Sequence, residues 1–191
     1  MTDQDDSLLA LRALLAERST RRGQFTLASG RSSSLYIDAR LTTMSPEGLA
    51  LIGPLGLSAL RHAGWRVDAV GGLTLGADPI AYAISYASAI AGDGPSIRAF
   101  TVRKEAKSHG TGRLIEGPFR AGDRVAVVED VITTGASALR AAEAVRAAGG
   151  HVTGVLALVD REEGGRDALE RAGFEVRSLT RASDIVALLP A

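Results

Sequence analysis

The sequence contains no cysteine, and this absence excludes disulfide bonds, thiolate metal sites and cysteine nucleophiles. It also lacks an excess of either charge, because Lys plus Arg and Asp plus Glu number 22 each. A balanced charge argues against nucleic acid or an anionic membrane as a partner. No apolar run approaches the about 18 residues of a membrane-spanning helix, and acids precede the first apolar stretch, unlike in a secretory signal. We therefore expect a soluble cytoplasmic protein.

What the chain does contain is a regular alternation of strand and helix patterns. Short apolar strands are expected at 67–72, 96–104, 124–130, 151–161 and 174–180. Helices are expected at 7–18, 45–63, 77–92, 138–150 and 182–191. Ser7 and Ser45 are expected to cap the first two helices. Nearly continuous apolar strands that alternate with helices indicate an α/β fold, in which helices cover both faces of a parallel sheet.

Four stretches with polar residues or glycines follow four successive predicted strands, at 71–76, 103–113, 129–137 and 160–161. In parallel α/β sheets, ligands bind beyond the carboxyl ends of the strands. Because the four stretches share that position, the sequence predicts one binding site at this edge of the sheet.

The stretch VAVVEDVITTGAS, residues 125–137, places two acids at the end of an apolar strand. Glu129 and Asp130 can accept hydrogen bonds from hydroxyl groups there, whereas a buried and unpaired carboxylate would be costly. The hydroxyls and backbone amides of residues 133–137 lie at the start of the next helix, where the helix dipole favours an anion. The pattern predicts a site for a phosphorylated sugar. The alternative is an ordinary strand end followed by a capped helix.

A basic, glycine-containing loop follows the second predicted strand of this group. It carries Arg103, Lys104, Lys107, His109 and Arg113, with Glu105 as the acid among them. Cations beside a phosphate site could stabilise a departing anion. Taken alone, the same loop could be a solvated surface segment.

Four motifs resemble those of the orotate phosphoribosyltransferases, a family among the type I phosphoribosyltransferases. They are FTLASGRSSSLYIDAR (25–40), GGLTLGADPIA (71–81), RKEAKSHGTGRLIEG (103–117) and VVEDVITTGAS (127–137). The resemblance implies the type I phosphoribosyltransferase fold, with a central, mostly parallel sheet flanked by helices, a small N-terminal hood and a flexible catalytic loop. It implies a single domain over residues 1–191, with an N-terminal helix and hood in 1–44, an α/β core in 45–180 and a C-terminal helix in 181–191.

The resemblance also implies the reaction. Orotate displaces diphosphate from 5-phosphoribosyl 1-diphosphate (PRPP), giving orotidine 5′-monophosphate for pyrimidine biosynthesis. Mg²⁺ is expected as the cofactor, bound mainly through substrate and water, with no dedicated metal site on the protein. The resemblance further implies a homodimer in which the catalytic loop of one subunit reaches the site of the other.

Residue roles are implied for the positions that match the family motifs. The catalytic residues are Lys104, Lys107, His109 and Asp130. The residues that bind PRPP are Arg103, Lys104, Lys107, His109, Glu129, Asp130, Val131, Ile132, Thr133, Thr134, Gly135, Ala136 and Ser137. The residues that bind orotate are Leu35, Tyr36, Thr133 and Arg161, the last as a clamp for the carboxylate.

Two positions depart from the family pattern, and three alternatives stay open. Many members have lysines where this chain has Ala28 and Gly76, and Arg31 or Arg40 could replace them. Arg161 could instead be a strand-end residue paired with Asp160. The enzyme could use a base other than orotate, or the chain could be a PRPP-sensing regulator of the same fold.

Overall fold

The computed structural model describes residues 3–26, 32–105 and 114–190. Its centre is a six-stranded sheet. The strand order is β5-β4-β3-β6-β7-β8, and every neighbouring pair is parallel except β4 with β5. The strands are β3 (Ala69–Leu73), β4 (Arg98–Val102), β5 (Ile115–Glu116), β6 (Arg124–Ile132), β7 (His151–Asp160) and β8 (Val176–Arg181). The five predicted strands are thus confirmed with small shifts of their ends, and β5 is an addition.

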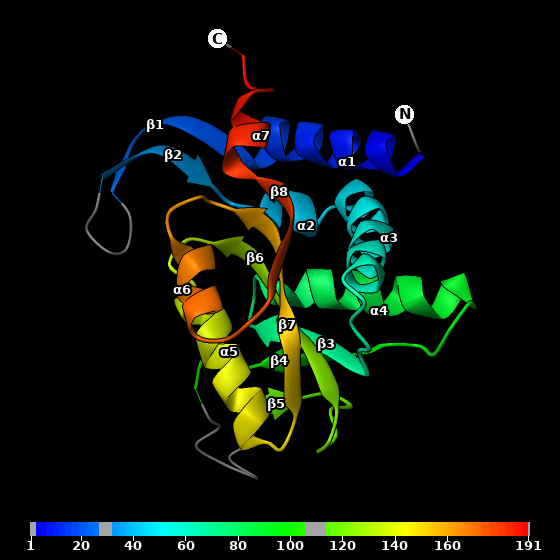
Figure 1. Cartoon of the computed structure of the whole chain (residues 1–191). Coiled ribbons are helices and arrows are strands. Elements are labelled where there is room, and N and C mark those ends of the chain that lie inside the picture. The colour runs from blue at the N-terminus through cyan, green and yellow to red at the C-terminus, as the bar shows by residue number, and fades with distance from the viewer. Residues whose placement is uncertain (1–2, 27–31, 106–113, 191) are drawn as a thin grey trace.

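Helices cover both faces of this sheet (Figure 1). On one face lie α1 (Asp3–Leu14), α3 (Pro46–His62), α4 (Ala77–Ala91) and α7 (Ala182–Val186). On the other lie α5 (Ala136–Ala147) and α6 (Gly165–Arg171). Neighbouring residues of β6 separate into two cores, because Val127 packs with the α5 side and Val128 with the α3 side. Both faces of the strands are buried, which explains their continuous apolar sequences and confirms the α/β prediction.

Helix ends follow the sequence in one case and correct it in two. Ser45 caps α3 as predicted, accepting a hydrogen bond from the Gly48 amide. Ser7 does not cap α1, since that helix begins at Asp3 with three acids in its first turn, where the helix dipole favours them. A π-helical turn, Leu15–Ser19, follows α1. The helix predicted at the C-terminus ends at Val186, shortly before Pro190, which cannot continue a helix.

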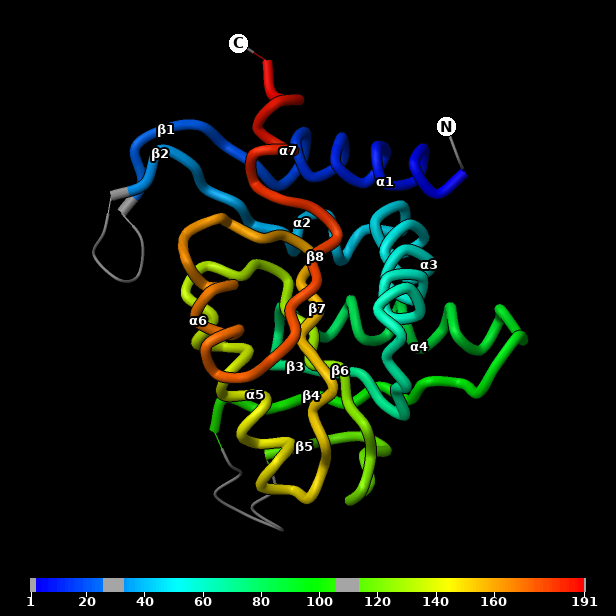
Figure 2. The backbone as a smooth tube through the Cα atoms, viewed as in Figure 1, coloured from blue at the N-terminus to red at the C-terminus, as the bar shows by residue number. Residues whose placement is uncertain are grey.

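A separate two-stranded ribbon, hereafter the hood, consists of antiparallel β1 (Thr20–Thr26) and β2 (Ser32–Ile37). Figure 2 shows it at the same end of the molecule as α1, α7 and the C-terminus. The rings of Phe25 and Tyr36 contact each other across the ribbon, with centroids 5.3 Å apart. A short helix, α2 (Arg40–Thr43), joins the hood to α3.

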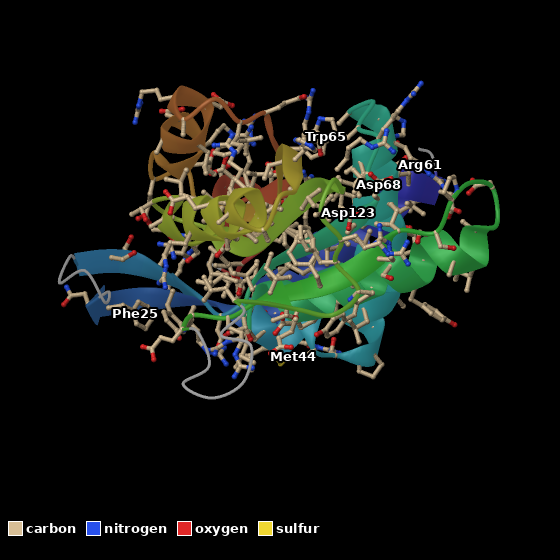
Figure 3. All side chains as sticks on the ribbon, turned by 90° about the horizontal axis from the view of Figure 1, so that it is seen from below. Phe25, Met44, Arg61, Trp65, Asp68 and Asp123 are labelled. Carbon is tan, nitrogen blue, oxygen red and sulfur yellow. The ribbon has the colours of Figure 1, made fainter. Side chains whose placement is uncertain are left out.

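The two edges of the central sheet differ in chemistry. At the amino ends of the strands, Asp68 pairs with Arg124 and Asp123 pairs with Arg98. Figure 3 shows Asp68 and Asp123 well away from Phe25 of the hood. The acids and the arginine predicted to bind substrate lie at the opposite, carboxyl edge. These ion pairs therefore lie at the amino edge of the sheet, whereas the predicted site residues lie at its carboxyl edge.

Candidate active site

One cavity of about 360 Å³ lies between the hood and the carboxyl ends of β3, β6 and β7. All four predicted strand-end stretches contribute to it. Its lining comprises Tyr36, Ile37, Asp38, Ala39, Arg40, Leu73, Thr74, Leu75, Gly76, Lys104, Glu129, Asp130, Val131, Thr133, Ser137 and Arg161. Predicted phosphate, ribose and orotate residues thus share one cavity.

The two acids at the end of β6 are both poorly solvated. Burial, with a smaller contribution from the charge of Asp130, raises the pKa of Glu129 to about 8. Burial also raises the pKa of Asp130, although the Val131 amide donates to its Oδ1 at 2.9 Å and opposes that shift. Glu129 Oε2 is buried and finds no hydrogen-bond partner among the described residues. It can accept a hydrogen bond from a ligand hydroxyl.

The raised pKa of Glu129 predicts a pH-dependent stability. Between its ordinary pKa and about 8, the folded state holds a proton that the unfolded state has lost. The free energy of unfolding therefore falls as pH rises through this window, by up to about 1.4 kcal/mol per pH unit, and levels off above it. Glu129→Gln mimics the neutral side chain, so we expect its stability advantage over wild type to grow from pH 5 to pH 9. Thermal unfolding across that range measures it.

The matched control is Glu143→Gln, because Glu143 is exposed on α5. Its unfolding temperature should follow wild type in parallel at every pH. Parallel curves for Glu129→Gln as well would contradict a buried, protonated Glu129.

The predicted phosphate turn leads directly into α5. Gly135 has φ +81°, and a Cβ there would lie 3.0 Å from the Gly165 carbonyl oxygen, so this turn favours glycine. Thr133 and Ser137 line the cavity, whereas Thr134 is exposed beside it and does not belong to the described lining. Amides at the start of a 12-residue helix favour an anion there.

Ile132 does not fit the list of ligand residues in the same way. Its side chain is buried in the core on the α5 side of the sheet. Its carbonyl oxygen accepts a hydrogen bond from the Arg161 amide at 2.9 Å. Successive side chains of a strand point to opposite faces, so Val131 lines the cavity whereas Ile132 points into the core. Ile132 therefore supports the site through its backbone and does not contact the cavity with its side chain.

Arg161 is buried, 8% exposed, and lines the cavity. Nη2 donates to three oxygens, namely Glu163 Oε1 at 2.6 Å, Ser33 Oγ at 3.2 Å and the Leu35 carbonyl at 3.2 Å. Nε is buried and lacks a hydrogen-bond partner in the described part of the chain. An anchored guanidinium with a free donor suits a carboxylate ligand.

The alternative pairing of Arg161 with Asp160 is wrong. Asp160 Oδ2 accepts from Arg166 Nε at 2.8 Å, and Asp160 Oδ1 accepts from the Glu162 amide at 2.9 Å. Both carboxylate oxygens are therefore used within the turn after β7. Glu162 has φ +59°, uncommon for a residue other than glycine, and this bend brings Glu163 back to Arg161.

The two predicted hood residues differ in what they offer. The Tyr36 side chain is 42% exposed and lines the cavity, as an aromatic wall would. The Leu35 side chain packs against the core, and its carbonyl oxygen, not its side chain, meets Arg161. The expected apolar wall is therefore formed by Tyr36 and Ile37.

The backbone at Gly76 leaves no room for the side chain of a lysine. A Cβ on this backbone would collide with the carboxylate of Asp130, so the glycine allows the turn after β3 to approach the acid. Arg40, one of the two suggested replacement cations, lines the cavity but already forms an ion pair with Asp38. Its Nε donates to Asp38 Oδ1 at 2.8 Å and its Nη2 donates to Asp38 Oδ2 at 2.9 Å. Ala28 and Arg31 lie outside the described residues.

Only the base of the predicted catalytic loop is described. Lys104 is exposed and lines the cavity. Arg103 Nη1 donates to Glu116 Oε1 at 3.0 Å, an ion pair between the ends of β4 and β5. Lys107 and His109 lie outside the described residues, as does Arg113.

Sequence reasoning assigned no role to four residues of this site. They are Asp38, Glu163, and Thr74 and Leu75 of the predicted stretch 71–76. The signal for Glu163 was present, since EEGG follows the strand-end arginine and glycines permit a tight return of the chain.

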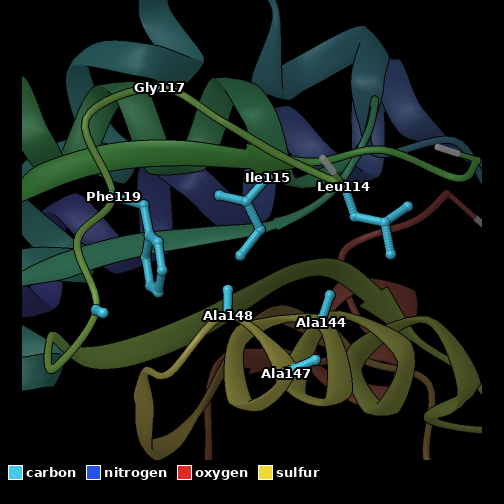
Figure 4. Close-up of a pocket in the computed structure, with 8 residues that line it drawn as sticks. Leu114, Ile115, Gly117, Phe119, Ala144, Ala147 and Ala148 are labelled. Atoms are coloured by element: carbon cyan, nitrogen blue, oxygen red, sulfur yellow. The ribbon is translucent and has the colours of Figure 1, made fainter. Parts of the chain in front are cut away.

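A second cavity, of about 520 Å³, lies between β5 and α5 (Figure 4). Its described lining is apolar, with Ile115 and Phe119 facing the alanines of α5. None of the side chains described there is ionisable.

Within the described ranges, no three His, Cys, Asp or Glu side chains gather where they could hold a metal ion. In the same ranges, no helix combines the length and apolarity needed to cross a bilayer. The expected cytoplasmic location stays a prediction.

Comparison with known proteins identifies the family of the chain. No protein-family model matches the chain. The orotate phosphoribosyltransferase of Aquifex aeolicus is 49% identical over 162 residues, covering 85% of this chain and 86% of that protein. That of Rhodopirellula baltica is 44% identical over 181 residues, covering 93% of each chain.

A solved structure extends the agreement to the fold. The crystal structure of Mycobacterium tuberculosis orotate phosphoribosyltransferase in complex with PRPP superposes with a TM-score of 0.78 at 42% identity. The match covers 94% of this chain and 99% of that one. The resemblance drawn from the motifs and the expected type I fold are both confirmed. The chain belongs to the orotate phosphoribosyltransferase family.

Proposed function

We propose that the protein transfers the phosphoribosyl group of PRPP to orotate, giving orotidine 5′-monophosphate and diphosphate. The observation that carries this proposal is the buried Arg161, which lines the same cavity as Glu129 and Asp130 and whose Nε has no hydrogen-bond partner among the described residues. Glu163 already pairs with Nη2 of this guanidinium, and its remaining donors suit an anionic ligand group such as the orotate carboxylate. A neutral base would leave the Nε donor without a partner, at a cost typical of unsatisfied buried groups.

Each part of the cavity then has a role in holding the reactants. Arg161 orients the orotate carboxylate, and Thr133 and Tyr36 border the ring. Glu129 and Asp130 accept hydrogen bonds from the ribose hydroxyls. The amides before α5 hold the 5′-phosphate. This arrangement fixes a ring nitrogen of orotate against the anomeric carbon, which supplies much of the rate through proximity.

In the reaction, a bond forms between that nitrogen and the anomeric carbon while the bond to the diphosphate oxygen breaks, and the nitrogen gives up its proton to the solvent. Positive charge develops on the ribose ring and negative charge on the departing diphosphate. In this proposal Asp130, which lines the cavity, stabilises the positive charge. Lys104, with Lys107 and His109 by resemblance, stabilises the negative charge. Removing one such pre-organised contact typically costs about 10²- to 10³-fold in rate.

Mg²⁺ fits this site as a companion of the substrate. The buried Glu129 Oε2 that lacks a protein partner can accept a hydrogen bond from a ribose hydroxyl or from water on the ion. We propose that Mg²⁺ would enter with PRPP and would be held mainly through substrate and water. When bound, it neutralises charge on the leaving group.

The assay that tests the function mixes the protein with orotate, PRPP and Mg²⁺ and follows the loss of orotate absorbance. Adenine, hypoxanthine and uracil serve as alternative acceptors. Turnover of orotate alone supports the proposal. Turnover of another base without orotate would assign a different transferase, and PRPP binding without any turnover would favour a regulator.

We also propose a homodimer in which the catalytic loop is shared between subunits. An exposed apolar stripe supports a partner subunit, because Tyr82, Tyr86 and Ile90 follow one another at four-residue spacing along α4. They are 53%, 69% and 65% exposed. Contiguous exposed apolar side chains of this kind mark interaction surfaces.

Mixing two inactive variants tests the sharing of the loop. Lys107→Ala removes a loop cation and Arg161→Ala removes the orotate clamp, so we expect each variant alone to be nearly inactive. After subunit exchange, a mixed dimer has one site with both defects and one intact site, and activity should return. Separate preparations of each variant, treated in the same way, are the control. Absence of any recovery, with exchange verified by mass, would place the loop in its own subunit's site.

A further inference from the structure

Asp78, in the first turn of α4, accepts a hydrogen bond on each oxygen of its carboxylate. Thr74 Oγ1 donates to Oδ2 at 2.8 Å, and Thr101 Oγ1 donates to Oδ1 at 2.8 Å. Thr74 follows the end of β3, and Thr101 belongs to the neighbouring strand β4. One half-buried carboxylate therefore fastens the turn after β3 to the adjacent strand.

The turn that Asp78 holds, residues 74–76, forms a wall of the active-site cavity. Thr74 and Lys104 line both this cavity and a neighbouring one of about 540 Å³. At the other end of the turn, Gly76 packs directly against Asp130. A shift of the turn would therefore alter the space between the acid of β6 and the cation of the loop.

We propose that Asp78 is a positioning residue for PRPP, acting through Thr74 on the turn at residues 74–76. The inference rests on the proposed function, because it takes PRPP as the ligand of this cavity. An acid in the first turn also interacts with the helix dipole, but that interaction needs no specific partner. Two threonine hydroxyls from separate segments, each directed at its own carboxylate oxygen, define the position of the turn much more closely.

The hydrogen-bond network continues to the surface of the protein. Tyr82 OH lies 3.0 Å from Thr101 Oγ1. Because the Thr101 hydroxyl donates to Asp78, it accepts from Tyr82. Tyr82 belongs to the exposed stripe of α4, so one chain of hydrogen bonds runs from that stripe to the wall of the cavity.

The experiment compares the binding of Mg²⁺–PRPP and of orotate to wild type, Asp78→Ala, Asp78→Asn and Thr74→Val, by calorimetry and by steady-state kinetics. We expect Asp78→Ala to raise the Kd and KM for PRPP by about tenfold or more, since two hydrogen bonds to a charged acceptor are lost. The KM for orotate should stay within about twofold, because Arg161 is untouched. Asp78→Asn, which retains one acceptor oxygen, should fall between the two.

The matched control is Asp93→Ala, which removes an acid just beyond the same helix that pairs with the distant Arg61. It should bind PRPP like wild type. If Asp78 acts through Thr74, a double variant that combines Asp78→Ala with Thr74→Val should have a Kd for PRPP close to the higher Kd of the two single variants. Additive effects, PRPP binding within twofold of wild type, or equal losses for both substrates with a lower unfolding temperature would each overturn the proposal. Binding of PRPP is measured without orotate turnover, so an incorrect base assignment would not affect this result.

Discussion

Arg161→Ala is expected to lower kcat/KM for orotate by about a hundredfold or more, while the Kd for PRPP changes little. Each charge-assisted hydrogen bond to the orotate carboxylate contributes about 1.5–3 kcal/mol, and the guanidinium offers a pair of them. The loss also removes the 2.6 Å contact between the guanidinium and Glu163 Oε1. Steady-state kinetics with each substrate varied in turn measures the effect.

Two further variants separate charge from geometry. Arg161→Lys keeps the positive charge but cannot form the paired hydrogen bonds, so we expect a loss close to that of alanine. Arg177→Ala removes an exposed arginine of β8 that pairs with Glu175, and it should behave like wild type. Equal losses for orotate and PRPP in Arg161→Ala would mean that the residue supports the fold and not the base.

Introducing the family's lysine at position 76 is expected to harm this protein. The Cβ of either Gly76→Lys or Gly76→Ala would collide with the Asp130 carboxylate, which must then move. Overpacking of this kind costs about 1–3 kcal/mol, so we expect kcat/KM for PRPP to fall by about ten- to a hundredfold. Both variants should lose activity to a similar extent, because the Cβ and not the cation is responsible.

Gly94→Ala is the matched control, since a Cβ at Gly94 meets open space. It should leave the kinetics and the unfolding temperature unchanged. A gain in PRPP affinity for Gly76→Lys over Gly76→Ala would contradict this reasoning, because it would show that the turn can move and that the cation reaches the substrate.

The sheet and the place of the site could be predicted because both depend on local patterns. Strands β6 and β7 are buried on both faces, and their continuous apolar residues show it directly. Parallel strands bring their carboxyl ends to one edge, so residues as distant as Gly76, Asp130 and Arg161 could be placed together without any knowledge of contacts.

The hood could not be predicted from periodicity. Its first strand, TRRGQFT, has few apolar residues and no alternation, since much of it is exposed. Only the family resemblance suggested a hood, and its pairing as β1 with β2 comes from the structure.

The partner of Arg161 was beyond the sequence for a different reason. Asp160 is its immediate neighbour, but Arg166 of α6 already occupies that carboxylate. The choice of Glu163 depends on the bend at Glu162, whose backbone adopts a conformation uncommon for its residue type. Such pairings are decided by the three-dimensional path of a turn, which spacing along the chain does not reveal.

The three contacts of Arg161 Nη2 link the position of the hood to the predicted orotate site. One nitrogen joins Ser33 and the Leu35 carbonyl of the hood to Glu163 of the core. Moving the hood away from Arg161 would free hydrogen-bond donors on the guanidinium, and moving it closer would engage those donors with the hood. We therefore expect variants that displace the hood to change the affinity for orotate as well.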